Sequence, residues 1–299
     1  MKWQGRERSS NIEDRRGQGG GGFGGNLGGL GTGRIPMGRA GGGGLGLIGI
    51  IVVLGIIWFV TGQNPLDMVT GNGGSVAPQS QQWSPSSNAG QDELAGFVGV
   101  VVKDTENLWT DVFKQNNLTY RPPKVVLFSD ATQSACGVAQ SASGPFYCPN
   151  DKSVYIDLAF YDQLRQQFGA PGDFAQAYVI AHEIGHAVQD QTGILPEFNQ
   201  KRGSMSQEQQ NAYSVKVELQ ADCYAGVWAN YVNRENYLEQ GDVEEAIKAA
   251  NQIGDDTLTR GQVSSRNFTH GTSEQRMAWL KKGMQTGDVS QCDTFQGSN

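Results

Sequence analysis

The order of apolar and polar residues separates an uncharged apolar run near the start of the chain from a mixed segment that follows it. No charged residue occurs between Arg39 and Asp67, and this stretch includes the run LGLIGIIVVLGIIWFV over residues 45–60. About 20 uncharged, mainly apolar residues suffice for a helix to cross the bilayer core. The pattern therefore predicts one transmembrane helix over residues 40–62. A cleaved signal peptide is the alternative, but this run begins too far from the N-terminus and is too long for a signal core.

The later part of the chain has one helical segment, then strand-like segments, then helical spacing to the end. Apolar residues recur at helical intervals over residues 92–116. The two predicted strands are KVVLFSD (124–130) and SVYIDLAFY (153–161), which are enriched in β-branched and aromatic residues. A few strands followed by helices predict an α+β fold for one domain over residues 91–299.

One predicted helix has clear boundaries. Pro171 and Gly172 break the chain before it, Asp173 is the expected N-cap, and Gln176 is the expected capping-box partner. Gly193 is the expected residue after its C-terminus. Because the first half of this helix contains a single polar residue, we expect it to be buried on most faces.

Composition predicts two segments without a core. Glycine dominates residues 17–49, and so little apolar side chain cannot offset the entropy lost on ordering. We therefore expect residues 1–39 to form a disordered Gly-rich tail. Residues 63–90 are rich in Gly, Ser, Gln, Asn and Pro, which is the composition of a flexible linker.

Charge predicts an orientation in the membrane. Seven of the 23 basic residues but only three of the 30 acidic residues precede Ala40; the seven are Lys2, Arg6, Arg8, Arg15, Arg16, Arg34 and Arg39. An excess of Lys and Arg marks the cytoplasmic side of a span. The expected location is the inner (cytoplasmic) membrane in a single pass, with the N-terminus cytoplasmic and the domain periplasmic or extracellular. The rest of the chain keeps 16 basic against 27 acidic residues, which argues against nucleic acid as a partner.

The four cysteines, all after the apolar run, are Cys136, Cys148, Cys223 and Cys292. An even number outside the cytoplasm predicts two disulfides, for which three pairings exist. We favour Cys136 with Cys148, across a short loop, which leaves Cys223 to tie a helix to Cys292. Buried thiols are the alternative. No CxxC spacing occurs, so a cysteine zinc site is not expected.

The segment VIAHEIGHAVQD, residues 179–190, contains two of the three histidines of the chain. His182 and His186 project from one face of the predicted helix, so both imidazoles can bind one Zn2+ ion. Glu183 lies close enough to a metal-bound water to take its proton as a general base. This is the HExxH pattern of metallopeptidases, although the pattern alone also occurs in helices that bind nothing. The apolar surroundings favour zinc, because buried histidines and a buried glutamate need partners.

A catalytic zinc site needs a third protein ligand. The segment KVELQADCYAG places Glu218 and Asp222 four positions apart on one helical face. Glu218 is the predicted third ligand, and Asp222 is predicted to accept the outward N–H of a ligand histidine. Small side chains at Ala221 and Gly185 would let the two helices approach closely. The alternative is a solvated acidic helix face.

The third histidine, His270, lies in RNFTHGTSEQRMAWLKKG. Thr272 and Gln275 are predicted to open the helix that follows, and Gly283 is predicted to end it. A loop histidine held by this helix can donate to the oxyanion of a tetrahedral intermediate as a catalytic residue. A purely structural role is the alternative.

These motifs together resemble one known family. The opening MKWQGRERSSNIEDRRG, the single apolar run, the Gly-rich tail, AHEIGHAVQ and ELQADCYAG are similar to the YpfJ family of neutral zinc metallopeptidases over essentially the whole chain. The resemblance implies a zincin-like fold in which His182, His186 and Glu218 bind zinc and Glu183 is the general base. It also implies that the strand at residues 153–160 borders the cleft and pairs with an extended peptide. The run HGTSEQR is similar to a segment of HtpX-like membrane peptidases.

The resulting prediction is a membrane-anchored zinc-dependent peptidase that hydrolyses peptide bonds with a zinc-activated water and Glu183 as base. Its expected partners are a peptide or protein substrate and the membrane. The alternative from another class is a catalytically silent zincin-like binding or chaperone module of the cell envelope, which has no use for Glu183. A structural envelope protein would bind no metal and would leave the histidines unexplained.

Overall fold

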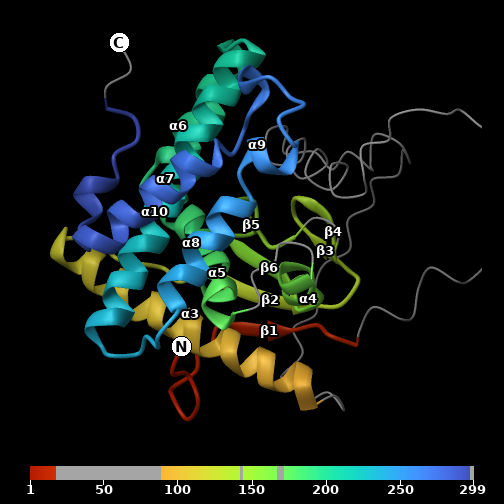
Figure 1. Ribbon diagram of the computed structural model, residues 1–299, viewed down its shortest axis with the longest axis vertical. Helices are drawn as coiled ribbons and strands as arrows, with labels where there is room; N and C mark the ends of the chain where they lie inside the picture. Colours follow the sequence, from red (N-terminus) through yellow and green to blue (C-terminus); the bar gives the residue numbers. More distant parts are fainter. Residues whose placement is uncertain (18–88, 142–143, 167–171, 297–299) are drawn as a thin grey trace, which may run out of the picture.

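The structure is a computed structural model that describes four segments of the chain (Figure 1), residues 1–17, 89–141, 144–166 and 172–296. These segments are mainly helical and include a small sheet, which confirms the α+β class. The predicted transmembrane helix at 40–62 lies outside the described residues, as does nearly all of the predicted linker. No helix in the described segments is long and apolar enough to cross a membrane.

A four-stranded sheet has the strand order β1, β2, β6, β5. Its strands are β1 (Ile12–Asp14), β2 (Lys124–Phe128), β5 (Phe146–Cys148) and β6 (Ser153–Asp157). β1, β2 and β6 are parallel, and β5 is antiparallel to β6. The two strands predicted from sequence are therefore confirmed as β2 and β6. A separate hairpin consists of β3 (Ala131–Ser134) and β4 (Gly137–Gln140).

β6 lies inside the sheet and not at its border. It pairs with β2 on one side and with β5 on the other, so neither backbone edge remains for a peptide. The expectation that residues 153–160 pair with a substrate is therefore wrong. β5 is the outer strand on this side of the sheet. The sequence did not predict it, because three residues are too few to show the alternation of apolar and polar positions that identifies a strand.

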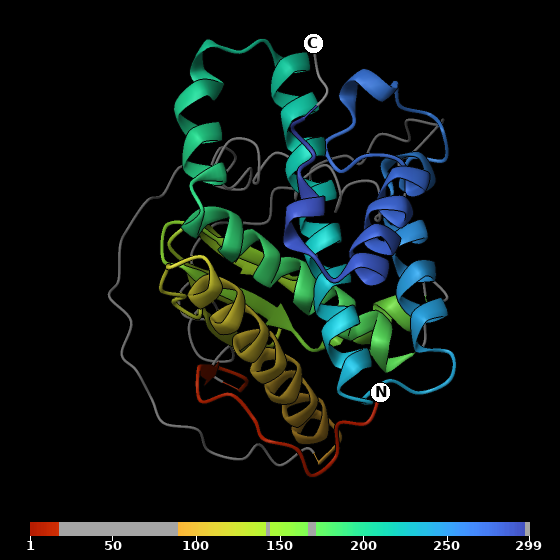
Figure 2. The same ribbon diagram turned by 90° about the vertical axis from the view of Figure 1, so that its left-hand side faces the viewer.

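Helices pack around the sheet and against one another (Figures 1 and 2). α5 packs against α3, α7 and α8, and α7 also packs against α10. The helices of the described segments are α3 (Ala89–Gln115), α4 (Ala159–Gln166), α5 (Asp173–Gln191), α6 (Ile194–Lys201), α7 (Gln207–Arg234), α8 (Asp242–Gln252), α9 (Asp255–Leu258) and α10 (Ser273–Thr286).

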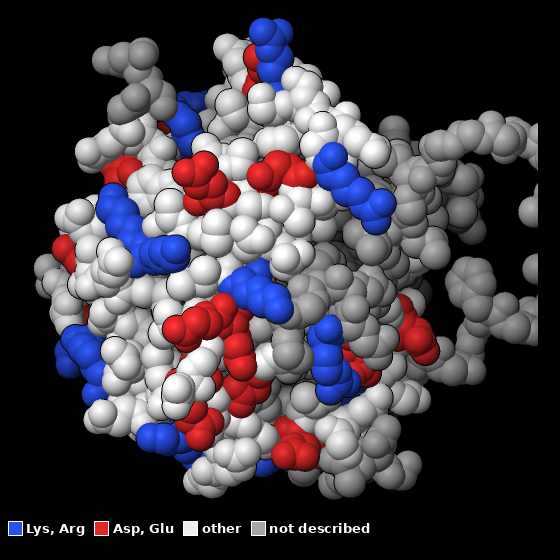
Figure 3. All heavy atoms as spheres, in the orientation of Figure 1, with Lys and Arg blue, Asp and Glu red and all other residues white. Residues whose placement is uncertain are grey.

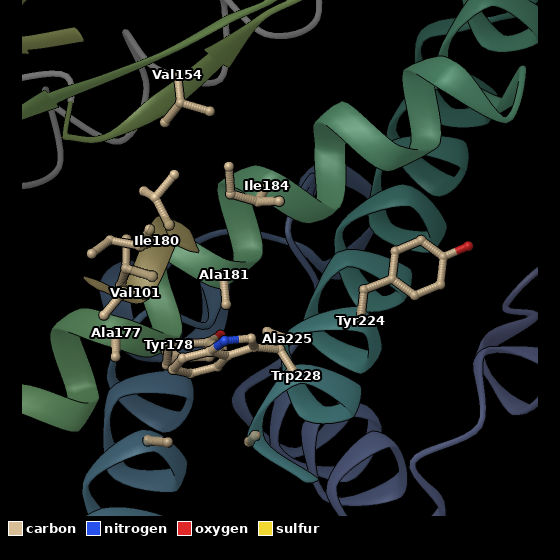
Figure 4. Close-up of a cluster of buried hydrophobic side chains, with 14 of the residues drawn as sticks. Val101, Val154, Ala177, Tyr178, Ile180, Ala181, Ile184, Tyr224, Ala225 and Trp228 are labelled. Carbon is tan, nitrogen blue, oxygen red and sulfur yellow. The ribbon is translucent and has the colours of Figure 1, made fainter. Parts of the chain in front are cut away.

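The core lies where α5 meets the sheet and α7. Figure 4 shows Ile184 of α5 on the side of Val154 from β6, while Trp228 of α7 lies on the opposite side of α5. Trp228 stacks on Phe174 with 5.4 Å between the ring centroids. Every residue from Phe174 to Ala181 except Gln176 is buried, as the apolar pattern predicted.

The start of α5 differs from the prediction. The helix begins at Asp173, but its N-cap is the preceding glycine and no side chain caps it. The Asp173 carboxylate lies instead 2.6 Å from the Met1 ammonium group, and the Phe174 N–H donates to Glu245 at 3.2 Å. Long-range partners therefore replace the predicted capping box. Gly193 has the expected left-handed conformation, with φ 91°.

The predicted start of α10 is confirmed, and its predicted end is wrong. The predicted capping box of Thr272 and Gln275 is present. Gly283 does not end the helix, which continues to Gly287 at φ 60°. A Cβ atom on Gly283 would overlap the carbonyl oxygen of Cys223 in α7, so this glycine permits close packing of the two helices.

Both favoured disulfides, Cys136–Cys148 and Cys223–Cys292, are present. The first ties the turn between β3 and β4 to β5. The second ties α7 to the C-terminal 3₁₀ helix η4 (Val289–Cys292). All four cysteines are therefore paired.

Residues 1–17, which we call the N-terminal strap, are part of the fold. The prediction of a disordered tail over residues 1–39 is wrong for this part. β1 extends the sheet beside β2, and the Arg16 guanidinium is buried against Asp14 and Asp92. The prediction assigned the charged residues of the strap to a disordered tail, because their partners are distant in sequence: Asp92, which Arg16 contacts, lies 76 positions away.

Replacing Arg16 by Ala is expected to lower the free energy of unfolding by about 3 kcal/mol, because the buried Asp14 carboxylate loses its cation. The Arg16 side chain is 1% exposed and donates to the two Asp14 oxygens at 2.9 and 2.6 Å. Urea unfolding of the full-length protein measures the change. Arg234→Ala, at the exposed end of α7, is the control. Equal stability of the two variants would contradict a structural role of the strap.

Candidate metal centre

Three buried side chains from α5 and α7 converge. His182 and His186 on α5 and Glu218 on α7 offer ligand atoms that all lie within 4.8 Å of one another. The Glu218 carboxylate lies 3.1 Å from His182 Nε2 and 3.5 Å from His186 Nε2. The structure thus brings the three predicted ligands together. Two imidazole nitrogens and one carboxylate oxygen form a donor set that fits zinc, and three protein ligands are the usual number in catalytic zinc sites.

The two helices approach closely at Gly185 and Ala221, as expected. A Cβ atom on Gly185 would lie 3.3 Å from both the Cα and the carbonyl oxygen of Ala221. A larger residue at Gly185 would push the helices apart and move the histidines away from Glu218. These two small residues therefore set the distance between the two parts of the ligand group.

Asp222 orients His182, as the sequence predicted. His182 Nδ1 donates to Asp222 Oδ1 at 2.9 Å. Two residues that the sequence did not indicate also hold this carboxylate: Arg276 of α10 donates to both oxygens at 2.8 and 2.9 Å, and the Tyr178 hydroxyl donates at 2.6 Å. Burial raises the pKa of Asp222, but Arg276 and His182 lower it by more, to about 2.

His186 has an outer partner that the sequence interpretation missed. Its Nδ1 donates to Gln189 Oε1 at 2.8 Å, and Gln189 Nε2 donates to the Val217 carbonyl oxygen at 2.7 Å. Both ligand histidines therefore use Nδ1 for an outer partner and direct Nε2 at Glu218. The i, i+3 spacing of His186 and Gln189 on a buried helix was the available signal.

Glu183 is buried beside the ligand group. Burial raises its pKa to about 7, although the charge of His182 and a hydrogen bond from the Tyr147 N–H act in the opposite direction. Tyr147 belongs to β5, and its hydroxyl donates to Asp190 of α5 at 2.7 Å. β5 is thereby held against α5 at two points. A carboxylate with a pKa near neutrality can accept a proton and return it at pH 7.

His270 is paired with Asp255, with 3.3 Å between Nδ1 and Oδ1. Asp255 Oδ2 also accepts the backbone N–H groups of Thr269, His270 and Gly271 at 2.8, 2.7 and 3.0 Å, so this acid fixes the whole loop. Burial lowers the pKa of His270, but the carboxylates of Glu218 and Asp255 raise it by more. Sequence reasoning missed Asp255, because no local pattern links it to a loop 15 residues later.

The two ligand histidines differ in pKa. Burial lowers the pKa of His182, but Asp222 and Glu218 raise it by more, to about 10. Burial lowers the pKa of His186 to about 4. The Glu218 carboxylate raises this pKa and the positive charge of His182 lowers it further, so the net shift is downward. The protein alone therefore keeps a proton on His182, between two carboxylates. An environment that stabilises this positive charge also favours the binding of a metal cation.

The chain was compared with known proteins. A family model described as "Putative neutral zinc metallopeptidase" matches residues 1–295. The chain belongs to this family. The uncharacterized protein YpfJ of Escherichia coli strain K12 is 46% identical over 299 residues, which cover 99% of each chain. An uncharacterized protein of Mycobacterium tuberculosis strain H37Rv is 42% identical over 219 residues, which cover 68% of this chain and 72% of that protein. No solved structure matches.

Membership of the neutral zinc metallopeptidase family confirms the resemblance drawn from the sequence motifs. The matched region begins in the strap and ends after η4. The family name implies zinc, and the buried group of His182, His186 and Glu218 fits that ion.

On the face shown in Figure 3, basic and acidic side chains are interspersed and form no continuous basic stripe. The absence of a nucleic-acid partner stays a prediction.

Zinc affinity is expected to rise about tenfold per pH unit between about pH 7.5 and 8.5, because zinc must displace one proton from the protein. His182 carries that proton at these pH values, since its pKa is raised to about 10, while His186, with a pKa of about 4, is already neutral. Competition with a chelator of known affinity measures the slope. Calorimetry in two buffers of different ionisation enthalpy counts the released proton independently. An affinity that does not change with pH would contradict the pairing of His182 with two carboxylates.

Arg276→Met is expected to weaken zinc binding by about 10–100-fold, because Asp222 loses the partner that keeps it charged and oriented toward His182. The free energy of unfolding should fall by about 3 kcal/mol, since a buried carboxylate loses its cation. Chelator competition and urea unfolding measure the two effects. Lys281→Met, exposed on the same helix, is the control. Unchanged zinc affinity in Arg276→Met would remove Arg276 from the support of the metal centre.

Proposed function

We propose that this member of the neutral zinc metallopeptidase family hydrolyses peptide bonds, with zinc held by His182, His186 and Glu218. The observation that supports the proposal is the buried three-residue ligand group with Glu183 beside it. When bound, zinc supplies a Lewis acid that polarises a carbonyl group and makes a water molecule more acidic. The proposed substrate is a peptide or protein, and attachment to a membrane through residues 40–62 is part of the proposal.

Glu183 is the proposed general base. Its carboxylate would accept a proton from water and return it to the leaving amine. Burying a carboxylate costs free energy, because its charged form loses hydration. A silent binding or chaperone module has no use for a buried carboxylate beside the metal, so nothing would offset the free energy that its burial costs. The burial of Glu183 and its pKa of about 7 therefore favour the peptidase over the silent module.

His270 is the proposed donor to the carbonyl oxygen, where negative charge develops during hydrolysis. Asp255 binds its Nδ1, which leaves Nε2 as the nitrogen for the substrate. The raised pKa of His270 favours the protonated form, which donates the stronger hydrogen bond. This pairing, with one ring nitrogen left for a substrate, supports the proposed catalytic role.

Glu183→Gln is expected to abolish peptide hydrolysis, with a loss of about 10²–10⁴-fold, and to leave zinc binding intact. The amide keeps the size of the side chain but cannot accept the proton. Full-length protein is assayed on a library of fluorogenic peptides, and bound zinc is measured by elemental analysis. Glu197→Gln, exposed on α6, is the control.

The same assay separates the proposed peptidase from the silent module. Hydrolysis by Glu183→Gln at the rate of the unmodified protein would exclude Glu183 as the base. If cells with Glu183→Gln keep every phenotype of the unmodified gene and the same set of envelope peptides, the binding module is the better description. Loss of bound zinc in neither His182→Ala nor Glu218→Gln would refute the metal site itself.

A further inference from the structure

The N-terminal strap is joined to the domain by backbone hydrogen bonds. The Val125 N–H of β2 donates to the Asn11 carbonyl oxygen at 2.9 Å, and the Arg15 N–H donates to the Leu127 carbonyl oxygen at 2.7 Å. Between these bonds β1 runs parallel to β2, as Figure 1 shows. A strap located elsewhere would leave these buried groups of β2 without partners.

The charged side chains of the strap are also paired inside the domain. Arg6 donates to Asp104 of α3, and its guanidinium lies 3.3 Å from the centroid of the Tyr237 ring. Arg16 lies 3.1 Å from Asp92 near the start of α3. The Asp104 side chain is buried, so loss of Arg6 would leave a buried charge without its cation. Residues that the charge count assigned to the cytoplasm therefore have their partners in the domain.

The first residue reaches the start of the helix that carries both ligand histidines. The Met1 ammonium group lies 2.6 Å from Asp173, 3.2 Å from Glu239 and 3.3 Å from Asp242. Burial lowers the pKa of this ammonium group, but the carboxylates raise it by more. Asp173 and Asp242 also belong to an acidic group that could hold a metal, but the ammonium group already lies among these oxygens, so we assign no metal there.

From these contacts we infer that the strap is an integral part of the metal-binding domain, and that both lie on the same side of any membrane to which the chain is attached. The predicted orientation, with a cytoplasmic N-terminus and an external domain, would separate them by a hydrocarbon layer of about 30 Å. No hydrogen bond or ion pair spans that distance, so the inference replaces the predicted orientation.

Thiol labelling of the full-length protein in cells tests the shared side. Single cysteines replace Ser10 in the strap and Glu244 on α8, both of which are exposed, while the four native cysteines are paired in disulfides. Spheroplasts are treated with a maleimide that does not cross membranes, before and after lysis. We expect both cysteines to be labelled before lysis or both only after it. Labelling of one cysteine before lysis and of the other only afterwards would overturn the inference.

Cross-linking in native membranes tests the docking of the strap directly. The Asn11 amide donates to Glu106 of α3 at 2.7 Å, so cysteines at these two positions lie within reach of a short bis-maleimide. We expect an internal cross-link that changes the migration of the chain on a denaturing gel. Glu208, near the start of α7 and at the far end of the molecule from β1 (Figures 1 and 2), replaces Glu106 in the control pair. If both thiols react singly but no cross-link forms, the strap is not docked and the inference fails.

Discussion

Two buried carboxylates one turn apart on α7, Glu218 and Asp222, constrain the arrangement of the central helices. A buried carboxylate without partners is costly, so each needs cations or hydrogen-bond donors. Asp222 receives donors from His182, Tyr178 and Arg276, and Glu218 faces the Nε2 atoms of the ligand histidines. These partners belong to α5 and α10. The requirement to balance two charges on one helix therefore fixes three helices relative to one another.

The strap meets a similar requirement at the start of α5. Asp173 lies on the first turn, where the positive end of the helix dipole favours a carboxylate, and the Met1 ammonium group is its direct partner. Arg6 and Arg16 hold the rest of the strap against α3 through acids on that helix. α5 is thus held by charges at its start and again at His182. The position of the ligand histidines depends on residues from both ends of the sequence.

Local spacing was sufficient for part of this structure. The i, i+4 pairs on α5 and α7 predicted the ligand group, and the short loop between Cys136 and Cys148 indicated one disulfide. Arg276 and Asp255 could not be identified in this way, because they lie 54 and 15 positions from their partners and charged residues on helices are usually solvated. The strap was misinterpreted for the same reason. Its basic residues match the excess of Lys and Arg that marks the cytoplasmic side of a membrane span, and only the fold shows which acidic residues they contact.

α10 connects the orientation of the first ligand to the loop of His270. The loop ends where Thr272 caps α10, and Arg276, the fourth residue of the helix, donates from Nε and Nη2 to Asp222. Because Gly283 allows α10 to contact the backbone of α7 directly, the two helices have little room to move independently. A displacement of α10 would shift the His270 loop and at the same time weaken the hydrogen bonds from Arg276 to Asp222. The proposed donor to the substrate and the support of the metal ligand are therefore coupled through α10, and the close packing at Gly283 contributes to the position of both.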